Sequence, residues 1–92
     1  MITKERKEEI ISRLNRIEGQ ISGVKKMVES GRLCLEILTQ ISSIHEALRG
    51  AGKVVMRNYL ETCVTKAIRS KDAQKTDETY KDLMDVIYKF AK

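Results

Sequence analysis

The sequence predicts an all-α fold, a three-helix protomer with a long central helix. The chain of 92 residues has no proline and only five glycines, the two residue types that most often interrupt helices. Apolar residues recur at helical spacing in three segments, and short polar stretches separate these segments. A chain of this length is expected to form a single domain over residues 1–92.

The first helix is expected to begin at Thr3 and to end at Ser30-Gly31. Thr3 can cap the N-terminus, and Gly31 suits the left-handed conformation that commonly follows a helix. Between these ends, apolar residues alternate at steps of four and three, which is one face of an amphipathic helix: Ile10, Leu14, Ile17, Ile21, Val24 and Val28.

The second helix is expected to run from about Arg32 to about Ile68, since Gly50 and Gly52 weaken it without breaking it. Such a helix is roughly 57 Å long, whereas a compact chain of this size has a radius of gyration of only about 12 Å. The rest of the chain cannot cover it. We therefore expect a homo-oligomer in which this helix packs against its counterpart in a second copy.

The third helix follows the polar stretch SKDAQKT, which is expected to supply a loop and a cap. Acidic residues lie early in the helix and lysines late, as the helix dipole favours. Its apolar face consists of Tyr80, Leu83, Met84, Ile87, Tyr88 and Ala91.

The charge distribution permits a nucleic-acid partner. The net charge is +5, and residues 1–70 hold the whole excess, with 13 Lys and Arg against 8 Asp and Glu. A basic face can neutralise phosphates, although a merely soluble basic surface explains the charge equally well. No apolar run approaches the roughly 18 residues of a membrane span, and the charged start is unlike a signal peptide, so we expect a cytoplasmic protein without a membrane partner.

The two cysteines, Cys34 and Cys63, are expected to be free thiols, metal ligands or redox sensors in a reducing compartment. On one regular helix they lie about 43 Å apart, too far for a disulfide within a chain, yet they point to nearly the same face. Antiparallel pairing of two such helices places Cys34 opposite Cys63 of the other copy. Burial of each cysteine as a small apolar residue is the alternative.

The neighbours of the two thiols suggest different roles. Cys34 falls in the first turn of the second helix beside Arg32, where the thiolate should be favoured, so it is the expected nucleophile. Tyr59 lies one turn before Cys63 and can donate a hydrogen bond to a sulfur anion or simply pack. His45 lies about 16 Å along the helix from the nearest cysteine layer, so we interpret it as a core or polar-layer histidine.

Two basic stripes are candidate DNA contacts. One lies beside the apolar face of the first helix, and the other is on the second helix at four-residue spacing. For Arg57 a surface ion pair explains the residue equally well. The sequence has no helix-turn-helix pattern, so no single recognition helix is expected. The candidates are Arg13, Arg16 and Gln20 on the first helix and Arg49 and Lys53 on the second, next to Arg57.

Over about residues 5–70 the sequence resembles the CsoR/RcnR family of small bacterial metal- and stress-sensing repressors. The motifs that carry the resemblance are RLNRIEGQISGVKKMVESGRLCLEILTQISSIHEAL and RNYLETCV. The resemblance implies an antiparallel helical-bundle dimer that assembles to a dimer of dimers, a homotetramer, with a sensing site shared by two chains. It also implies that Arg13, Arg16 and Gln20 help a basic face to grip operator DNA.

The copper sensors of this family use a cysteine and a His-x-x-x-Cys pair, which correspond to Cys34, Tyr59 and Cys63. Tyrosine is a poor ligand for Cu(I), so the chain looks most like the CstR-type branch, which responds to persulfides and other reactive sulfur species. The resemblance implies that Cys34 and Cys63 form di- or polysulfide crosslinks that release DNA, with no metal and no cofactor. The alternative is a Cu(I) site of the two cysteines alone.

Two further classes of function compete with a repressor. A thiol enzyme is disfavoured because the sequence places no general base near either cysteine, so no catalytic residue is assigned. A helical interaction module with an incidental basic charge would bind no DNA even at low salt.

Overall fold

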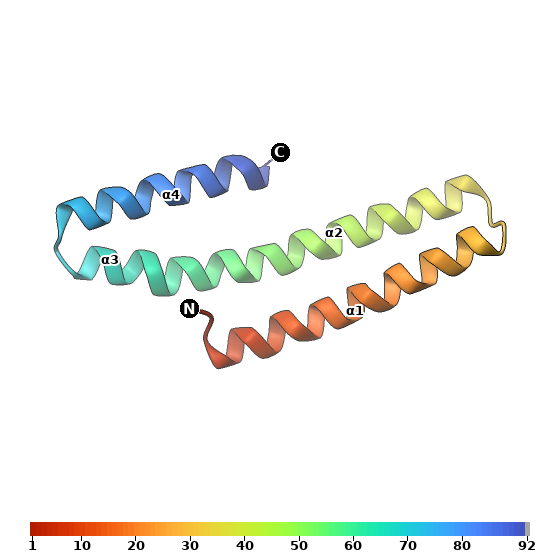
Figure 1. The fold of residues 1–92 in the computed structure, drawn as a ribbon, viewed down its shortest axis with the longest axis horizontal. Helices are drawn as coiled ribbons and strands as arrows, with labels where there is room; N and C mark the ends of the chain where they lie inside the picture. Colours follow the sequence, from red (N-terminus) through yellow and green to blue (C-terminus); the bar gives the residue numbers. More distant parts are fainter. Residues whose placement is uncertain (92) are drawn as a thin grey trace. The chain divides into compact units, whose positions relative to one another are not determined.

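The computed structural model describes residues 1–91, and all of its regular elements are helical (Figure 1). Because α2, η1 and α3 follow one another without a non-helical residue, they form one long central helix, and the predicted all-α fold of three helices is confirmed. The chain divides into two compact units, Ile2–Met56 and Met1 with Arg57–Lys92. The elements are α1 (Lys4–Glu29), α2 (Cys34–Tyr59), the π-helical turn η1 (Leu60–Val64), α3 (Thr65–Arg69) and α4 (Ala73–Ala91).

In the Ile2–Met56 unit, local chemistry sets both ends of α1 where the sequence predicts them. Thr3 Oγ1 accepts a hydrogen bond from the Arg6 N–H at 3.3 Å. At the other end Gly31 has φ +74°, and the Arg32 N–H donates to the Met27 carbonyl at 3.0 Å. These are the features of a Schellman motif, which satisfies carbonyls that the helix leaves unpaired.

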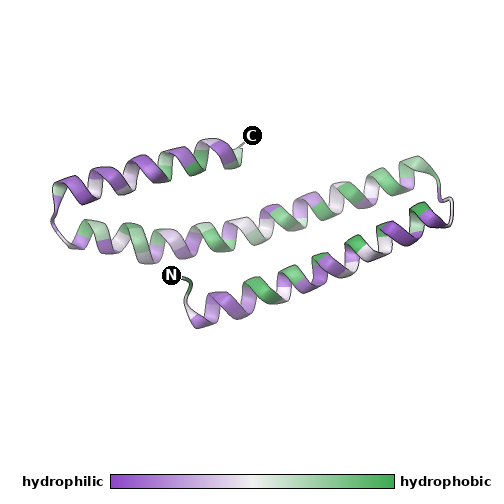
Figure 2. Cartoon of the chain, viewed as in Figure 1, coloured by the Kyte–Doolittle hydropathy of each residue, from purple (hydrophilic) through white to green (hydrophobic). Residues whose placement is uncertain are grey.

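A thin apolar core joins α1 to α2. Ile17 of α1 and Ile44 and Ala51 of α2 are buried together, with Val24 and Ala47 packed against them. Much of the remaining apolar surface of α2 stays exposed, and Figure 2 shows apolar residues recurring along that helix. This exposed surface includes Leu35, Leu38, Ile41, Leu48 and Val55.

One turn of the central helix departs from the predicted regular α-helix. Between Leu60 and Val64 the helix is π-helical, and the Thr65 N–H reaches back five residues to the Leu60 carbonyl. Threonine hydroxyls also bond to carbonyls here, Thr65 Oγ1 to Leu60 at 2.9 Å and Thr62 Oγ1 to Asn58 at 2.7 Å. Such bonds compete with the α-helical pattern, which gives a physical reason for the wider turn.

In the unit formed by Met1 and Arg57–Lys92, α4 packs against η1 and α3. Asp72 caps α4 through Oδ1, which accepts from the N–H groups of Gln74 and Lys75 at 3.1 and 3.2 Å. The helix therefore begins inside the SKDAQKT stretch that we expected to be loop and cap. Thr76 Oγ1 donates to the Ala67 carbonyl at 3.1 Å, and the buried Asn58 donates from Nδ2 to the Met1 carbonyl at the same distance.

No helix within residues 1–91 is both long enough and apolar enough to cross a membrane.

Candidate sensing and DNA-binding sites

Cys34 is the first residue of α2, and its side chain is exposed. The Leu33 carbonyl just before it accepts the N–H groups of Glu36 and Ile37, so Cys34 lies in the first turn as predicted. The Arg32 guanidinium, which we expected to stabilise a thiolate, forms an ion pair with Glu36 instead. The structure therefore places Cys34 exposed at a helix N-terminus, and its role as a nucleophile stays a prediction.

Cys63 lies inside the π turn and is half-buried. Its sulfur is 3.6 Å from Thr62 Oγ1, and the same hydroxyl oxygen is 2.7 Å from the Asn58 carbonyl oxygen. The shorter contact takes the proton, because a hydroxyl can donate only one hydrogen bond. Our expectation that Cys34 and Cys63 point to nearly the same face assumed a regular α-helix throughout, and η1 removes that assumption.

Tyr59 is the last residue of α2 and is half-buried. Burial of the phenol, and then the negative charges of Asp82 and Cys63, raise its pKa above the usual 10.0. Tyr59 therefore keeps its proton at neutral pH and can donate a hydrogen bond, whereas a metal would require it to lose that proton. The sequence analysis did not include Asp82, because only the packing of α4 brings it near Tyr59.

Within residues 1–91 no three side chains of His, Cys, Asp or Glu converge in a way that could hold a metal ion. His45 is exposed, so it is not a core histidine of this chain. Nickel and cobalt, which need several nitrogen donors, do not fit this set, whereas soft Cu(I) fits two cysteine thiolates.

The predicted DNA-contacting residues all lie in the Ile2–Met56 unit. Arg13, Arg16 and Lys53 are exposed, while Gln20 and Arg49 are half-buried. Glu9 lies between two arginines, at 3.4 Å from Arg13 Nε and 3.7 Å from Arg6 Nη1.

The surroundings of Gln20 and of Arg57 differ. The Gln20 Oε1 atom is buried without a hydrogen-bond partner among the described residues, so Gln20 is part of the packed interior as well as a candidate contact. Arg57 pairs with Glu61 at 2.8 Å, which is the surface ion pair that we gave as its alternative explanation.

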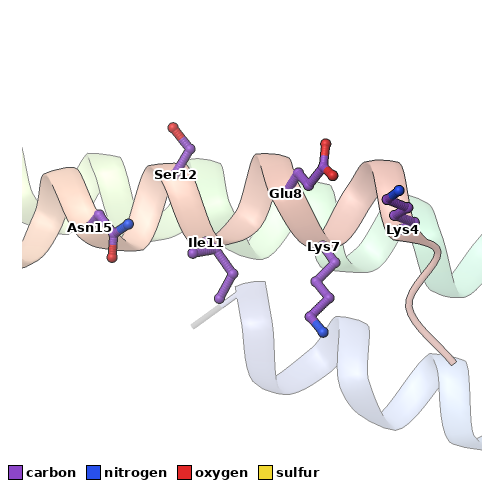
Figure 3. A pocket seen from close by; sticks show the side chains of 6 residues that line it. All are labelled: Lys4, Lys7, Glu8, Ile11, Ser12 and Asn15. Atoms are coloured by element: carbon purple, nitrogen blue, oxygen red, sulfur yellow. The ribbon is translucent and has the colours of Figure 1, made fainter.

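A hollow of about 540 Å³ lies along α1, and Figure 3 shows the side chains around it. It contains neither of the two thiols and none of the candidate DNA contacts, so it adds nothing to these sites. Its lining residues are Lys4, Lys7, Glu8, Ile11, Ser12 and Asn15.

Comparison with known proteins identifies a matching family and similar solved structures. The family described as metal-sensitive transcriptional repressor matches residues 6–89. The copper-sensing transcriptional repressor CsoR of Bacillus subtilis is 38% identical over 86 residues, which cover 94% of this chain and 82% of that protein.

Two solved structures share the fold. The copper-sensing repressor CsoR with Cu(I) from Geobacillus thermodenitrificans is 49% identical, with a TM-score of 0.87 over 100% of this chain and 95% of that one. The nickel-responsive regulator InrS is 29% identical, with a TM-score of 0.78 over 90% of each chain. These relatives are named as copper and nickel sensors, so they support the predicted CsoR/RcnR family but not the CstR-type branch.

Proposed function

This chain belongs to the family of metal-sensitive transcriptional repressors, and we propose that it binds operator DNA and releases it when an inducer reacts with Cys34 and Cys63. The family consists of repressors rather than enzymes, so the chain regulates transcription and does not catalyse a reaction. Because a bacterial repressor works where the chromosome is, we place it in the cytoplasm.

The observation that carries this proposal is that the two cysteines of one chain are not joined by other donor groups into a metal site within residues 1–91. Within residues 1–91 the two thiols are the only cysteine donors, and no group of three His, Cys, Asp or Glu side chains that could hold a metal ion includes either of them. A second copy can complete the site if α2 pairs antiparallel with its counterpart and brings Cys34 of one copy to Cys63 of the other.

The exposed face of α2 supports such pairing. Its residues recur at steps of four, three and finally seven, the spacing that characterises a helix-to-helix seam, and together they leave an apolar stripe in contact with water. We propose that this stripe forms the homodimer and that two dimers form a homotetramer. The seam consists of Cys34, Leu38, Ile41, His45, Leu48 and Val55, all exposed in the single chain.

Cu(I) is the inducer that the relatives support best, since the Bacillus and Geobacillus proteins are named as copper sensors. The two thiolates would hold this ion without a third ligand, because soft Cu(I) favours sulfur. Bound between two copies, it would fix one arrangement of the α2 pair. Basic residues such as Arg13 and Arg16 would then no longer match the DNA backbone.

Reactive sulfur is a second candidate inducer, and the protonated Tyr59 beside Cys63 favours it. The Cys34 thiolate would attack the sulfane sulfur of a low-molecular-weight persulfide, releasing a thiol and leaving a Cys34 persulfide. The partner's Cys63 would then attack the inner sulfur of that persulfide and expel hydrosulfide, which leaves an inter-subunit disulfide. Further sulfane sulfur would lengthen this link to a polysulfide.

One experiment separates the two inducers. Reduced, oxygen-free protein is bound to a duplex that it selects from a random-sequence pool and is then treated separately with Cu(I) and with an inorganic polysulfide. DNA release by a stoichiometric copper adduct without a covalent dimer supports the Cu(I) proposal. Release only with sulfur-containing crosslinks in the intact mass supports the persulfide alternative, and failure to select any duplex overturns both.

A further inference from the structure

We propose that Gly50 is a positioning residue that holds the Arg13 guanidinium in the orientation used for DNA binding. The inference rests on the proposed function, since it names how one of the predicted DNA contacts is prepared. Gly50 lies in the interior of α2, where its φ is not positive, so the backbone does not require glycine there. Glycine is also a poor helix former, so the helix itself does not benefit from it.

The Arg13 guanidinium lies next to the position that a side chain at Gly50 would occupy. A Cβ atom added at Gly50 would be 3.2 Å from Arg13 Nη1. Cβ atoms added at Gly19 or Gly23, which lie on α1, would meet no described atom within 4 Å. Because Gly50 has no side chain, the Arg13 guanidinium can lie against the backbone of α2. The two residues belong to the same compact unit.

Arg13 is held from two sides and remains accessible. Its Nε lies 3.4 Å from Glu9 Oε2 on α1, while its Nη1 lies against Gly50 on α2. The side chain is still 45% exposed, so a phosphate can reach the guanidinium. An arginine that is already oriented loses less conformational freedom on binding than one that moves freely, and this favours the complex.

A methyl group at position 50 would displace the Arg13 guanidinium but leave the packing of the helices unchanged. A contact of 3.2 Å is shorter than ordinary van der Waals contact, so the guanidinium would have to move by a few tenths of an ångström. The atom that moves is the far end of a flexible side chain, and alanine is the better helix former. The substitution G50A should therefore raise stability and weaken DNA binding, which are opposite effects of one change.

The test measures both quantities on the full-length protein with the duplex that the wild type selects from a random-sequence pool. We expect G50A to bind that duplex about twofold to tenfold more weakly, the lower part of the range typical of coupled neighbouring residues, with an equal or higher thermal unfolding midpoint. The matched control is G23A, which makes the same glycine-to-alanine change in open space. It should raise the unfolding midpoint and leave the dissociation constant unchanged.

A double-mutant cycle identifies the arginine as the group that responds. In the R13K background the positive charge remains but Nη1 is absent, so G50A should no longer weaken binding. The inference is overturned if G50A binds as tightly as wild type and G23A, if it weakens binding equally in the R13K background, or if it fails to fold. Failure of the wild type itself to select any duplex would instead refute the proposed function.

Discussion

The two compact units of this chain differ in regularity, and the difference follows their proposed roles. The Ile2–Met56 unit is a pair of ordinary α-helices with a small apolar core, and it holds all five predicted DNA contacts. The other unit contains a π turn, a left-handed Lys71 at φ +59° and threonine hydroxyls bonded to backbone carbonyls. Cys63 and Tyr59 lie in this irregular unit, which agrees with the tendency of π turns to occur at functional sites.

In the proposed function, the regular unit holds the predicted DNA contacts and Cys34, while the π turn of the other unit holds Cys63. Each of the following predictions changes one residue and measures the property that this comparison assigns to it.

Replacement of a thiol is expected to have the largest effect. C34S and C63S should each abolish release of DNA by the inducer, because each removes one of the two soft donors of the proposed site. DNA binding without inducer should stay within about twofold of wild type, since neither cysteine is among the predicted DNA contacts and such substitutions usually change free energies by about 0.5 kcal/mol or less. The measurement is fluorescence anisotropy of labelled duplex, with and without Cu(I) or polysulfide. A variant that still releases DNA normally would show that its cysteine is dispensable.

Ile17→Ala tests the core of the regular unit. Ile17 is 4% exposed and packs against Ile44 and Ala51, so its truncation should lower the free energy of unfolding by about 2–5 kcal/mol. Chemical denaturation followed by circular dichroism measures the change. Ile11→Ala on the exposed side of α1 is the matched control and should cost much less. If Ile17→Ala and Ile11→Ala lowered the free energy of unfolding equally, Ile17 would not belong to the core.

Asp72→Ala removes the N-terminal cap of α4 in the irregular unit. Two backbone N–H groups lose their acceptor, so stability should fall by about 1 kcal/mol. Thermal unfolding measures the effect, and Asp85→Ala in the same helix controls for loss of one negative charge. If the two aspartate variants unfold at the same temperature, the cap contributes nothing.

The smallest expected effect concerns the ionisation of Tyr59. Its pKa is raised by burial and by the charges of Asp82 and Cys63, so Asp82→Asn should lower that pKa toward 10.0. Because the folded state favours the protonated phenol, the associated stability is present below pH 10.0 and is lost as the pH rises through the folded value. Ultraviolet titration of tyrosinate follows the change, and Tyr59→Phe identifies the signal among the three tyrosines. An unchanged titration in Asp82→Asn would exclude the carboxylate as a cause.

Several features of fold and site could be read from the chain because short-range rules govern them. A helix cap involves residues three or four positions apart, as in the bond from Arg6 to Thr3, and Gly31 is the residue type that a left-handed turn favours. The position of Cys34 at the start of α2 followed from these same rules. The prediction of where α4 begins was less accurate, because Asp72 was one of several polar residues that could have capped the helix.

Other features depend on contacts that periodicity does not describe. The π turn results from a local competition for carbonyls by Thr62 and Thr65, which an average rotation per residue cannot represent. The approach of Asp82 to Tyr59 requires α4 to pack in its observed position.

The sequence by itself determined the all-α class, the three helical segments, the two thiols and the motifs of a repressor family. The physical reason is that helical periodicity, capping and side-chain chemistry act within about one turn of the chain. Only the tertiary structure decided that Arg13 lies over the bare backbone of Gly50 and that Asp82 raises the pKa of Tyr59. Both contacts join residues on different helices, so they exist only once packing has brought those helices together.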